Sequence, residues 1–425
     1  MKHLYILILL VLLPLQCLLA QTNSTETYYF LKPDRVFDGA QIHEGWQVLV
    51  HGNKIEAAGP NIQAPATAQI INLPGMTLLP GMIEGHSHLF LHPYNETNWN
   101  DQVLKESRAE RTARATVHAK NTLLAGFTTT RDLGTEGANY DDVGLKQAIN
   151  KGIIPGPRML VATKAIVATG SYGPKVFGAD LAAPVLGAAE ANGYDALIKE
   201  VRTQIGKGAD VIKVYADYRW GPNGEARPTF TEEEFKTIVA AANSSGRPVV
   251  AHASTAEGMR RAILAGVSTI EHGDDATPEI FKLMKKQGVA FCPTLAAGDA
   301  IVQYGGWQKN KQPEPIRLQE KRQSFVNAMK AGVTICMGGD VGVFTHGDNA
   351  REMVMMVDYG MKPLDVLCAA TTVNASVFGI SDKLGSIKPG LLADLVAVAG
   401  NPAADISQIR QVQFVMKDGE VYKKP

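Results

Sequence analysis

The stretch Leu78-Leu79-Pro80-Gly81-Met82-Ile83-Glu84-Gly85-His86-Ser87-His88 decides how the rest of the chain is interpreted. Pro80 and Gly81 interrupt the backbone, and the apolar and small residues around them predict a short buried strand that ends at the two histidines. Residues i and i+2 of a strand point to the same face, so the two imidazoles, about 7 Å apart, can approach one metal ion. Two alternatives stay open for the pair alone, half of a metal site or two polar loop residues, because histidine is common in both settings.

The composition narrows the class of protein. The chain has 425 residues, with 42 basic and 42 acidic side chains and a formal net charge of zero. Without a basic excess, neither nucleic acid nor an anionic membrane is an expected partner. The length, the 45% of hydrophobic residues and the 41 glycines fit a large α/β enzyme. Beyond the N-terminal segment, Cys292, Cys336 and Cys368 lie in apolar surroundings, which predicts buried thiols and no disulfide framework.

The first twenty residues differ from the rest. Lys2 and His3 precede an apolar run over 5–13, and Ala20 is followed by polar residues. This pattern predicts a secretory signal peptide over residues 1–20, and hence a secreted or periplasmic protein. A retained membrane anchor is the alternative, and no other segment is predicted to cross a membrane.

Between residues 81 and 380, short apolar segments alternate with predicted helices. Thr231 and Glu234 form a capping-box pattern, and the helix that they begin should end near Gly246. Thr277-Pro278 should begin another helix, which ends at Gly288. Eight such strand–helix units predict an α/β fold of the (β/α)8 TIM-barrel type. The strands are expected to end at the histidine pair and to span 128–132, 158–162, 211–215, 248–252, 268–272, 289–293 and 334–340.

Both ends of the chain have a different pattern. Residues 48–59 predict a β-hairpin with a turn at Gly52-Asn53, and 393–398, 412–416 and 420–422 predict further strands. We therefore expect a small β-sandwich built from residues 21–80 and 381–425, with a metal-dependent hydrolase barrel at 81–380 between them.

The predicted strand ends carry a set of residues able to bind metal. In a TIM barrel, functional side chains come from the C-terminal ends of different strands. Each residue alone has an ordinary explanation, as a hydrogen-bonded core histidine or as a turn aspartate. Their occurrence together on one rim predicts a metal centre. The residues are His86, His88, Lys213, His252, His272 and Asp340.

Lys213 has three interpretations, because a charged, unpaired lysine in a buried strand is costly. Its side chain could extend to the barrel mouth, or it could pair with a carboxylate such as Asp340. In the third interpretation burial lowers the pKa of the amine, and the neutral amine reacts with CO₂ to give an anionic carbamate that bridges two metals.

These six residues, with the runs 79–86 and 385–394, resemble the amidohydrolase superfamily over nearly all of the chain that follows the signal peptide. The chain is most similar to the branch related to imidazolonepropionase, which also contains dipeptidases acting on Xaa-Pro or Xaa-Arg/Lys. The resemblance implies two divalent metal ions. His86, His88, Asp340 and carboxylated Lys213 would hold one ion, and His252, His272 and the same carbamate the other. Nitrogen and oxygen ligands favour zinc, with manganese, iron or cobalt as alternatives.

The reaction expected from this set is hydrolysis of an amide in a small-molecule or dipeptide substrate. A hydroxide shared by two metals is a nucleophile at neutral pH, and Asp340 is the expected general base. Four loop residues could hydrogen-bond a peptide carboxylate, although an ordinary loop contact is the alternative for each. In related dipeptidases a tyrosine after the fourth strand is implicated, which makes Tyr218 the first choice. The four residues are Tyr172, Tyr218, Arg219 and His346.

Two other functions stay open at this point. One is a cyclic amidase of the imidazolonepropionase kind, or a lactonase, on the same fold. The other is a non-catalytic secreted binding protein, which would have no need of Asp340. The sequence defines neither the metal, nor the side-chain preference, nor the oligomeric state, so a homo-oligomer also stays open.

Overall fold

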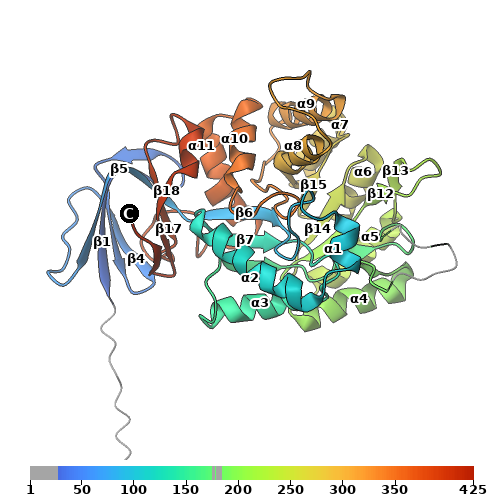
Figure 1. The fold of residues 1–425 in the computed structure, drawn as a ribbon, viewed down its shortest axis with the longest axis horizontal. Coiled ribbons are helices and arrows are strands. Elements are labelled where there is room, and N and C mark those ends of the chain that lie inside the picture. The colour runs from blue at the N-terminus through green and yellow to red at the C-terminus, as the bar shows by residue number, and fades with distance from the viewer. Residues whose placement is uncertain (1–26, 175–177, 179–183) are drawn as a thin grey trace, which may run out of the picture.

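The computed structural model describes residues 27–174, 178 and 184–425, so the predicted signal peptide lies outside the described residues. A sheet built from both ends of the chain lies beside a larger α/β body (Figure 1). Over the described ranges, no helix has both the length and the apolar character that crossing a bilayer requires.

The terminal sheet has eight strands in the order β19-β18-β17-β5-β1-β3-β4, with β2 beside β1. The predicted hairpin is confirmed by the antiparallel pair β3–β4, and β17 runs antiparallel to β5, which joins the two ends of the chain. This arrangement is consistent with the predicted β-sandwich. The strands are β1 (Tyr28–Phe37), β2 (Ile42–Glu44), β3 (Gln47–His51), β4 (Lys54–Gly59), β5 (Gln69–Pro80), β17 (Leu395–Ala399), β18 (Val412–Lys417) and β19 (Glu420–Lys423).

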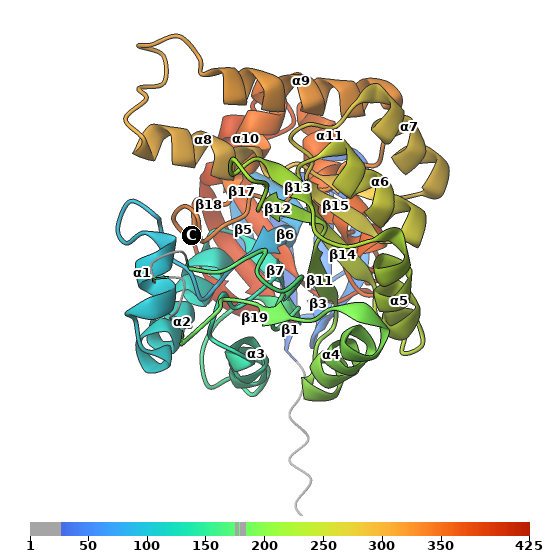
Figure 2. The same cartoon turned by 90° about the vertical axis from the view of Figure 1, so that its right-hand side faces the viewer.

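The α/β body contains two sheets of parallel strands, one of three strands and one of six. The first sheet comprises β6 (Met82–Ser87), β7 (Phe127–Asp132) and β8 (Arg158–Val161). The second comprises β9 (Ile166–Val167), β10 (Ala189–Glu190), β11 (Ile212–Tyr215), β14 (Val249–Ala253), β15 (Thr269–His272) and β16 (Ala290–Cys292). Helices surround these strands when the body is viewed from its free end (Figure 2). The predicted α/β class with parallel strands is confirmed, and the ladders between described residues form two sheets, not one continuous ring.

The segment predicted as the eighth strand is irregular, and that part of the prediction was wrong. It contacts the neighbouring strands through two isolated bridges, Phe291 to Ile335 and Ser87 to Val341, and through a hydrogen bond from the Gly85 N–H to the Met337 carbonyl (3.1 Å). The Glu84 carboxylate accepts hydrogen bonds from the backbone N–H groups of His86 (3.0 Å) and Gly339 (2.9 Å). A side chain thus takes the place of ladder hydrogen bonds here.

The helices follow their sequence signals. The structure confirms the capping box at α5 (Glu232–Asn243) and the proline start of α7 (Pro278–Gln287), which ends at Gly288 with a φ of 70°. The hairpin formed by β12 (Asp217–Arg219) and β13 (Ala226–Pro228) was not expected. The other α-helices are α1 (Trp99–Leu104), α2 (Arg108–Leu124), α3 (Asp141–Asn150), α4 (Gly193–Lys207), α6 (Ala256–Ala265), α8 (Leu295–Tyr304), α9 (Ile316–Ala331), α10 (Ala350–Asp358), α11 (Pro363–Cys368) and α12 (Asn374–Val377).

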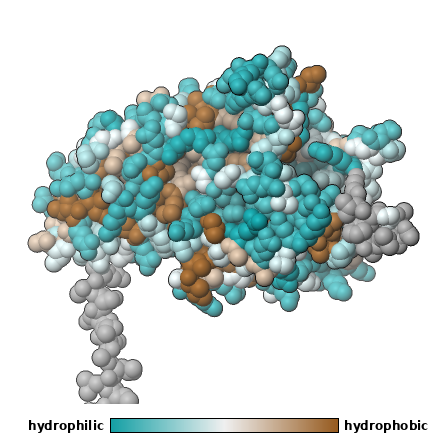
Figure 3. All heavy atoms as spheres, in the orientation of Figure 1, coloured by the Kyte–Doolittle hydropathy of each residue, from teal (hydrophilic) through white to brown (hydrophobic). Residues whose placement is uncertain are grey.

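Hydrophilic residues dominate the face shown in Figure 3, and some hydrophobic residues gather over the terminal sheet. Cys292 and Cys336 are buried free thiols, as predicted, and Cys368 is a free thiol that is partly buried.

Candidate metal centre and active site

Strained backbone marks the ends of the parallel strands. Non-glycine residues rarely adopt a positive φ, because the side chain then crowds the backbone, at a cost of about 1–3 kcal/mol. Such conformations persist where the surroundings over-determine them, and they gather at functional sites. Four of them lie at the end of a parallel strand or within four residues after it: Glu136 (48°) after β7, Thr163 (64°) after β8, His272 (73°) at the end of β15 and Thr294 (51°) after β16. Asp340 (61°) lies in the irregular segment after α9.

A cavity of about 650 Å³ opens at these strand ends, and five of the six predicted metal ligands line it: His86, His88, His252, His272 and Asp340. The sixth, Lys213, lies beneath them. It is only 1% exposed, and its Nζ atom lies 3.5 Å from His86 Nε2.

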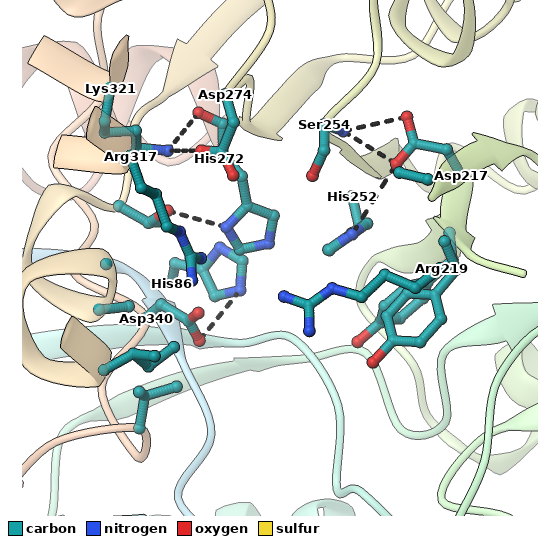
Figure 4. A pocket seen from close by; sticks show the side chains of 18 of the residues that line it. His86, Asp217, Arg219, His252, Ser254, His272, Asp274, Arg317, Lys321 and Asp340 are labelled. Carbon is teal, nitrogen blue, oxygen red and sulfur yellow. Dashed lines mark hydrogen bonds and ion pairs between the residues drawn. The ribbon is translucent and has the colours of Figure 1, made fainter. Parts of the chain in front are cut away.

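The ligand atoms converge on a small space (Figure 4). Asp340 Oδ1 lies 3.6 Å from His86 Nε2 and 3.4 Å from His88 Nε2. One ligand atom from each of His86, His272 and Asp340 lies within 4.8 Å of the other two. The ring centroid of His252 is 4.5 Å from that of His272. The structure thus brings all six predicted residues together.

Three of the four histidines that line the cavity have a hydrogen-bond partner at Nδ1. Nδ1 of His86 lies 2.8 Å from Glu271 Oε2, Nδ1 of His88 2.8 Å from the Gly134 carbonyl, and Nδ1 of His272 2.8 Å from Thr294 Oγ1. A carboxylate or carbonyl beside Nδ1 fixes the proton there, which leaves the Nε2 lone pair of His86 and His88 directed at the shared space. This donor set fits a divalent cation that prefers nitrogen and oxygen.

Burial sets the charge of the site. It lowers the pKa of His86 and His88 and brings the pKa of His252 to about 3, so these imidazoles are neutral, as ligands must be. Burial also lowers the pKa of Lys213, against the opposing charges of Glu271 and Asp340, and raises the pKa of Asp340. The neutral form of the Lys213 amine is therefore more accessible than that of an exposed lysine.

Sequence reasoning missed the polar residues that support the ligands. Glu271 accepts hydrogen bonds from His86 and, at 2.8 Å, from Arg131 Nη2, and the Arg131 Nε donates to the Gly85 carbonyl at 2.7 Å. Both side chains are buried in strands, at 0% and 2% exposure. Lys213 was singled out because a charged residue is unusual in a buried strand. The same criterion would have identified Arg131 and Glu271.

The structure places three of the four predicted substrate residues at the cavity. Tyr218 and Arg219 line it, and the Arg219 side chain extends into it (Figure 4). Tyr172 lines it too, although its hydroxyl donates a hydrogen bond to Glu136. His346 lies elsewhere, with Nε2 3.0 Å from the Leu91 carbonyl and its ring stacked on His118.

Charged residues form the opposite rim, near α9. Lys321 Nζ lies 2.5 Å from Asp274 and 2.7 Å from the His272 carbonyl, and Arg317 points into the cavity (Figure 4). The cavity can therefore accept an anionic group beside the four histidines that line it.

The sequence and the fold define the class of protein. Residues 77–422 match the model of the amidohydrolase family, and the chain belongs to that family. An ochratoxinase of Aspergillus niger is 30% identical over 382 residues, 82% of this chain and 76% of that protein. An imidazolonepropionase of Cutibacterium acnes is 24% identical over 362 residues, 83% of each chain.

A crystal structure of a Xaa-Pro dipeptidase, with methionine bound in its active site, is also similar. It superposes with a TM-score of 0.82 at 33% sequence identity, over 93% of this chain and 100% of that one. These relatives place the chain in the imidazolonepropionase-related branch and identify it as a hydrolase acting on carbon–nitrogen bonds.

Proposed function

We propose that this protein is a metal-dependent dipeptidase that hydrolyses Xaa-Pro substrates. The observation that carries the proposal is the convergence of all six candidate ligands at the end of a cavity of about 650 Å³, within the usual range of small-molecule sites. The similarity to a solved Xaa-Pro dipeptidase supports the choice of substrate. Xaa-Arg and Xaa-Lys dipeptides are the next candidates.

Two divalent ions, zinc in the first instance, would polarise the scissile carbonyl and make water acidic enough to attack at neutral pH. His86, His88, Asp340 and a carboxylated Lys213 would hold one ion, and His252, His272 and the carbamate the other. The buried amine of Lys213 supports the carbamate, because its lowered pKa favours the neutral form that reacts with CO₂.

Asp340 has the central part among the protein's own groups. Its carboxylate would take a proton from the attacking water and deliver it to the departing nitrogen. The departing nitrogen keeps the electron pair of the broken C–N bond, so it needs that proton to leave as a neutral amine. Tyr218 and Arg219 would bind the carboxylate of the C-terminal residue, since both line the cavity beside the histidines.

We also propose that the parallel strands close into a (β/α)8 barrel and that residues 1–20 are removed on secretion. The two bridges of the 335–341 segment and the hydrogen bond from Asp210 N–H to the Val161 carbonyl (2.8 Å) support closure. An experimental structure would test the barrel, and N-terminal sequencing of the exported protein would test the cleavage.

The function is tested by loading the protein with zinc, manganese or cobalt, measuring the bound metal by mass spectrometry, and screening substrates. Xaa-Pro, Xaa-Arg, Xaa-Lys, N-acyl amino acids, lactams and lactones cover the alternatives. We expect two metal ions per chain and the highest kcat/KM on Xaa-Pro. Turnover of lactams or lactones alone would establish the cyclic amidase or lactonase alternative. A protein that binds two metals and cleaves nothing would be a binding protein.

A further inference from the structure

Glu136 is a buried carboxylate in the cavity wall that the proposed mechanism does not use. It is 2% exposed and lines the cavity. Gly134, two residues earlier, accepts a hydrogen bond from His88. A Cβ atom at Gly134 would lie 3.4 Å from Glu136 Oε1 and 3.7 Å from His88 Cε1. The Glu136 carboxylate is therefore separated from the His88 ring by about the width of one methyl group.

The loop that carries Glu136 is held rigidly. Glu136 has a φ of 48°, a conformation that needs external support. The support comes from Arg111, whose buried guanidinium donates hydrogen bonds to the carbonyls of Phe90 (3.0 Å), Thr135 (2.9 Å) and Glu136 (2.7 Å). Arg111 therefore holds this loop next to the loop that follows His88. The Glu136 carboxylate consequently has a defined position.

The groups that hydrogen-bond to the Glu136 carboxylate are neutral, while the Arg111 guanidinium, bound to the Glu136 carbonyl, acts on it through its charge. Trp99 Nε1 and the Tyr172 hydroxyl donate to Oε2, the former at 3.0 Å, and the Tyr215 hydroxyl lies 3.5 Å from Oε1. Neutral donors stabilise a carboxylate without cancelling its charge, so it can still bind a cation. The faces of the surrounding aromatic rings attract cations as well. Trp99 and Tyr215 pack on Tyr172 with ring centroids 5.1 and 4.8 Å away.

Other carboxylates that line the cavity are engaged or exposed. Asp274 pairs with Lys321, and Asp217 accepts hydrogen bonds from the backbone of Ser254 and Thr255. Asp340 belongs to the predicted metal centre, while Asp275 and Glu320 are exposed. Glu136 combines burial, a fixed position and neutral partners.

Covalent geometry defines what such a group would bind. In a dipeptide the α-ammonium nitrogen lies two bonds, about 2.5 Å, from the carbon of the scissile carbonyl. A carboxylate that accepts a hydrogen bond from it must lie within about 5 Å of the reacting carbon. Glu136 Oε1 and His88 Cε1 both lie within 3.7 Å of the same point beside Gly134, so the carboxylate lies in the cavity wall next to a candidate metal ligand. Resting on the proposed dipeptidase function, we propose that Glu136 binds the substrate's α-ammonium group and restricts hydrolysis to dipeptides with a free amino terminus.

The test compares two substrates that differ only in that group, Ala-Pro and propionyl-proline. We expect the wild-type protein to prefer Ala-Pro. Glu136→Gln keeps the shape and a hydrogen-bond acceptor but removes the charge, so the ratio of the two kcat/KM values should fall about 10- to 100-fold, the range for a lost hydrogen bond to a charged group. Glu279→Gln, the same change at an exposed residue of α7 outside the cavity, is the matched control, and its ratio should stay within about threefold of wild type. Metal content should equal that of wild type in both variants.

An equal loss on both substrates in Glu136→Gln would assign the residue a structural role and overturn this inference, while the dipeptidase function would stand. A wild-type enzyme that cleaves propionyl-proline as fast as Ala-Pro would also overturn it, and this needs no variant to fold. If metal-loaded wild type cleaves neither substrate nor any other dipeptide, the proposed function fails and the inference falls with it.

Discussion

The floor and the rim of the cavity are built in different ways. On the floor, His86 and His88 are 1% and 5% exposed, and each imidazole is hydrogen-bonded through Nδ1 while Nε2 faces the shared space. On the rim, Arg219 and Arg317 are exposed and Tyr218 is partly exposed. Buried polar networks lose much when one partner is removed, whereas exposed charges are weakened by solvent and salt. The floor should therefore decide whether reaction occurs, and the rim should decide which substrate binds well.

The largest effect is expected at Lys213, because it is the one ligand proposed for both metals. Lys213→Ala should lower the bound metal below one ion per chain and reduce kcat/KM by about 1,000-fold or more, as expected when catalytic metal is lost. Short carboxylic acids, supplied as replacements for the carbamate, should restore part of both. Lys207→Ala, at the exposed end of α4, is the control. Full metal content in Lys213→Ala would show that the lysine is no ligand.

Asp340→Asn should have the next largest effect. The amide oxygen can still bind metal but the side chain cannot carry the proton, so kcat should fall about 100- to 10,000-fold in a metal-replete protein. Measuring kcat beside metal content separates this loss from the loss seen in Lys213→Ala. Unimpaired turnover by the metal-replete variant would remove Asp340 from the proton transfer.

Much of the fold follows from local sequence patterns. Strands such as β11 and β14 were predicted because short apolar runs alternate with helix signals. The 334–340 segment was predicted as a strand for the same reason, yet the Glu84 side chain, distant in sequence, binds the Gly339 N–H that a ladder would use. A strand as short as β9, with two residues, has no periodicity to detect.

The candidate site was predictable where residues follow strands and not where they lie in loops. Five of the six candidate ligands lie on or directly after β6, β11, β14 and β15, as predicted. The sixth, Asp340, was predicted at a strand end but lies in the irregular segment, and the structure brings all six together. Glu136 lies four residues after the end of β7, in a loop. The conformation of that loop depends on Arg111 of helix α2, which donates a hydrogen bond to the Glu136 carbonyl. The position of His346 likewise depends on how its loop turns, which places it against the Leu91 carbonyl.

Glu271→Gln tests whether the supporting residues of the floor matter as much as the ligands. The amide keeps the size of the side chain but leaves Arg131 without its anionic partner, and it holds the Nδ1 proton of His86 less firmly. Metal affinity should fall about 10- to 100-fold, as for other partners of metal-binding histidines. A zinc titration against a competing chelator measures it, with Glu279→Gln, exposed on α7, as the control. Unchanged affinity would confine the importance of the floor to the ligands themselves.

The smallest effect is expected on the rim, at Tyr218. Its ring packs edge-on against Tyr172 and Tyr215, at centroid distances of 4.8 and 5.8 Å, so Tyr218→Phe preserves the packing and removes only the hydroxyl. If that hydroxyl binds the substrate carboxylate, KM for Ala-Pro should rise about 3- to 10-fold with little change in kcat. The preference of wild type for Ala-Pro over Ala-Pro-amide should shrink by the same factor, because the amide lacks the charge that the hydroxyl would contact. A loss of kcat as large as that in Asp340→Asn would instead place Tyr218 in the chemistry of the floor and break the distinction between the two regions.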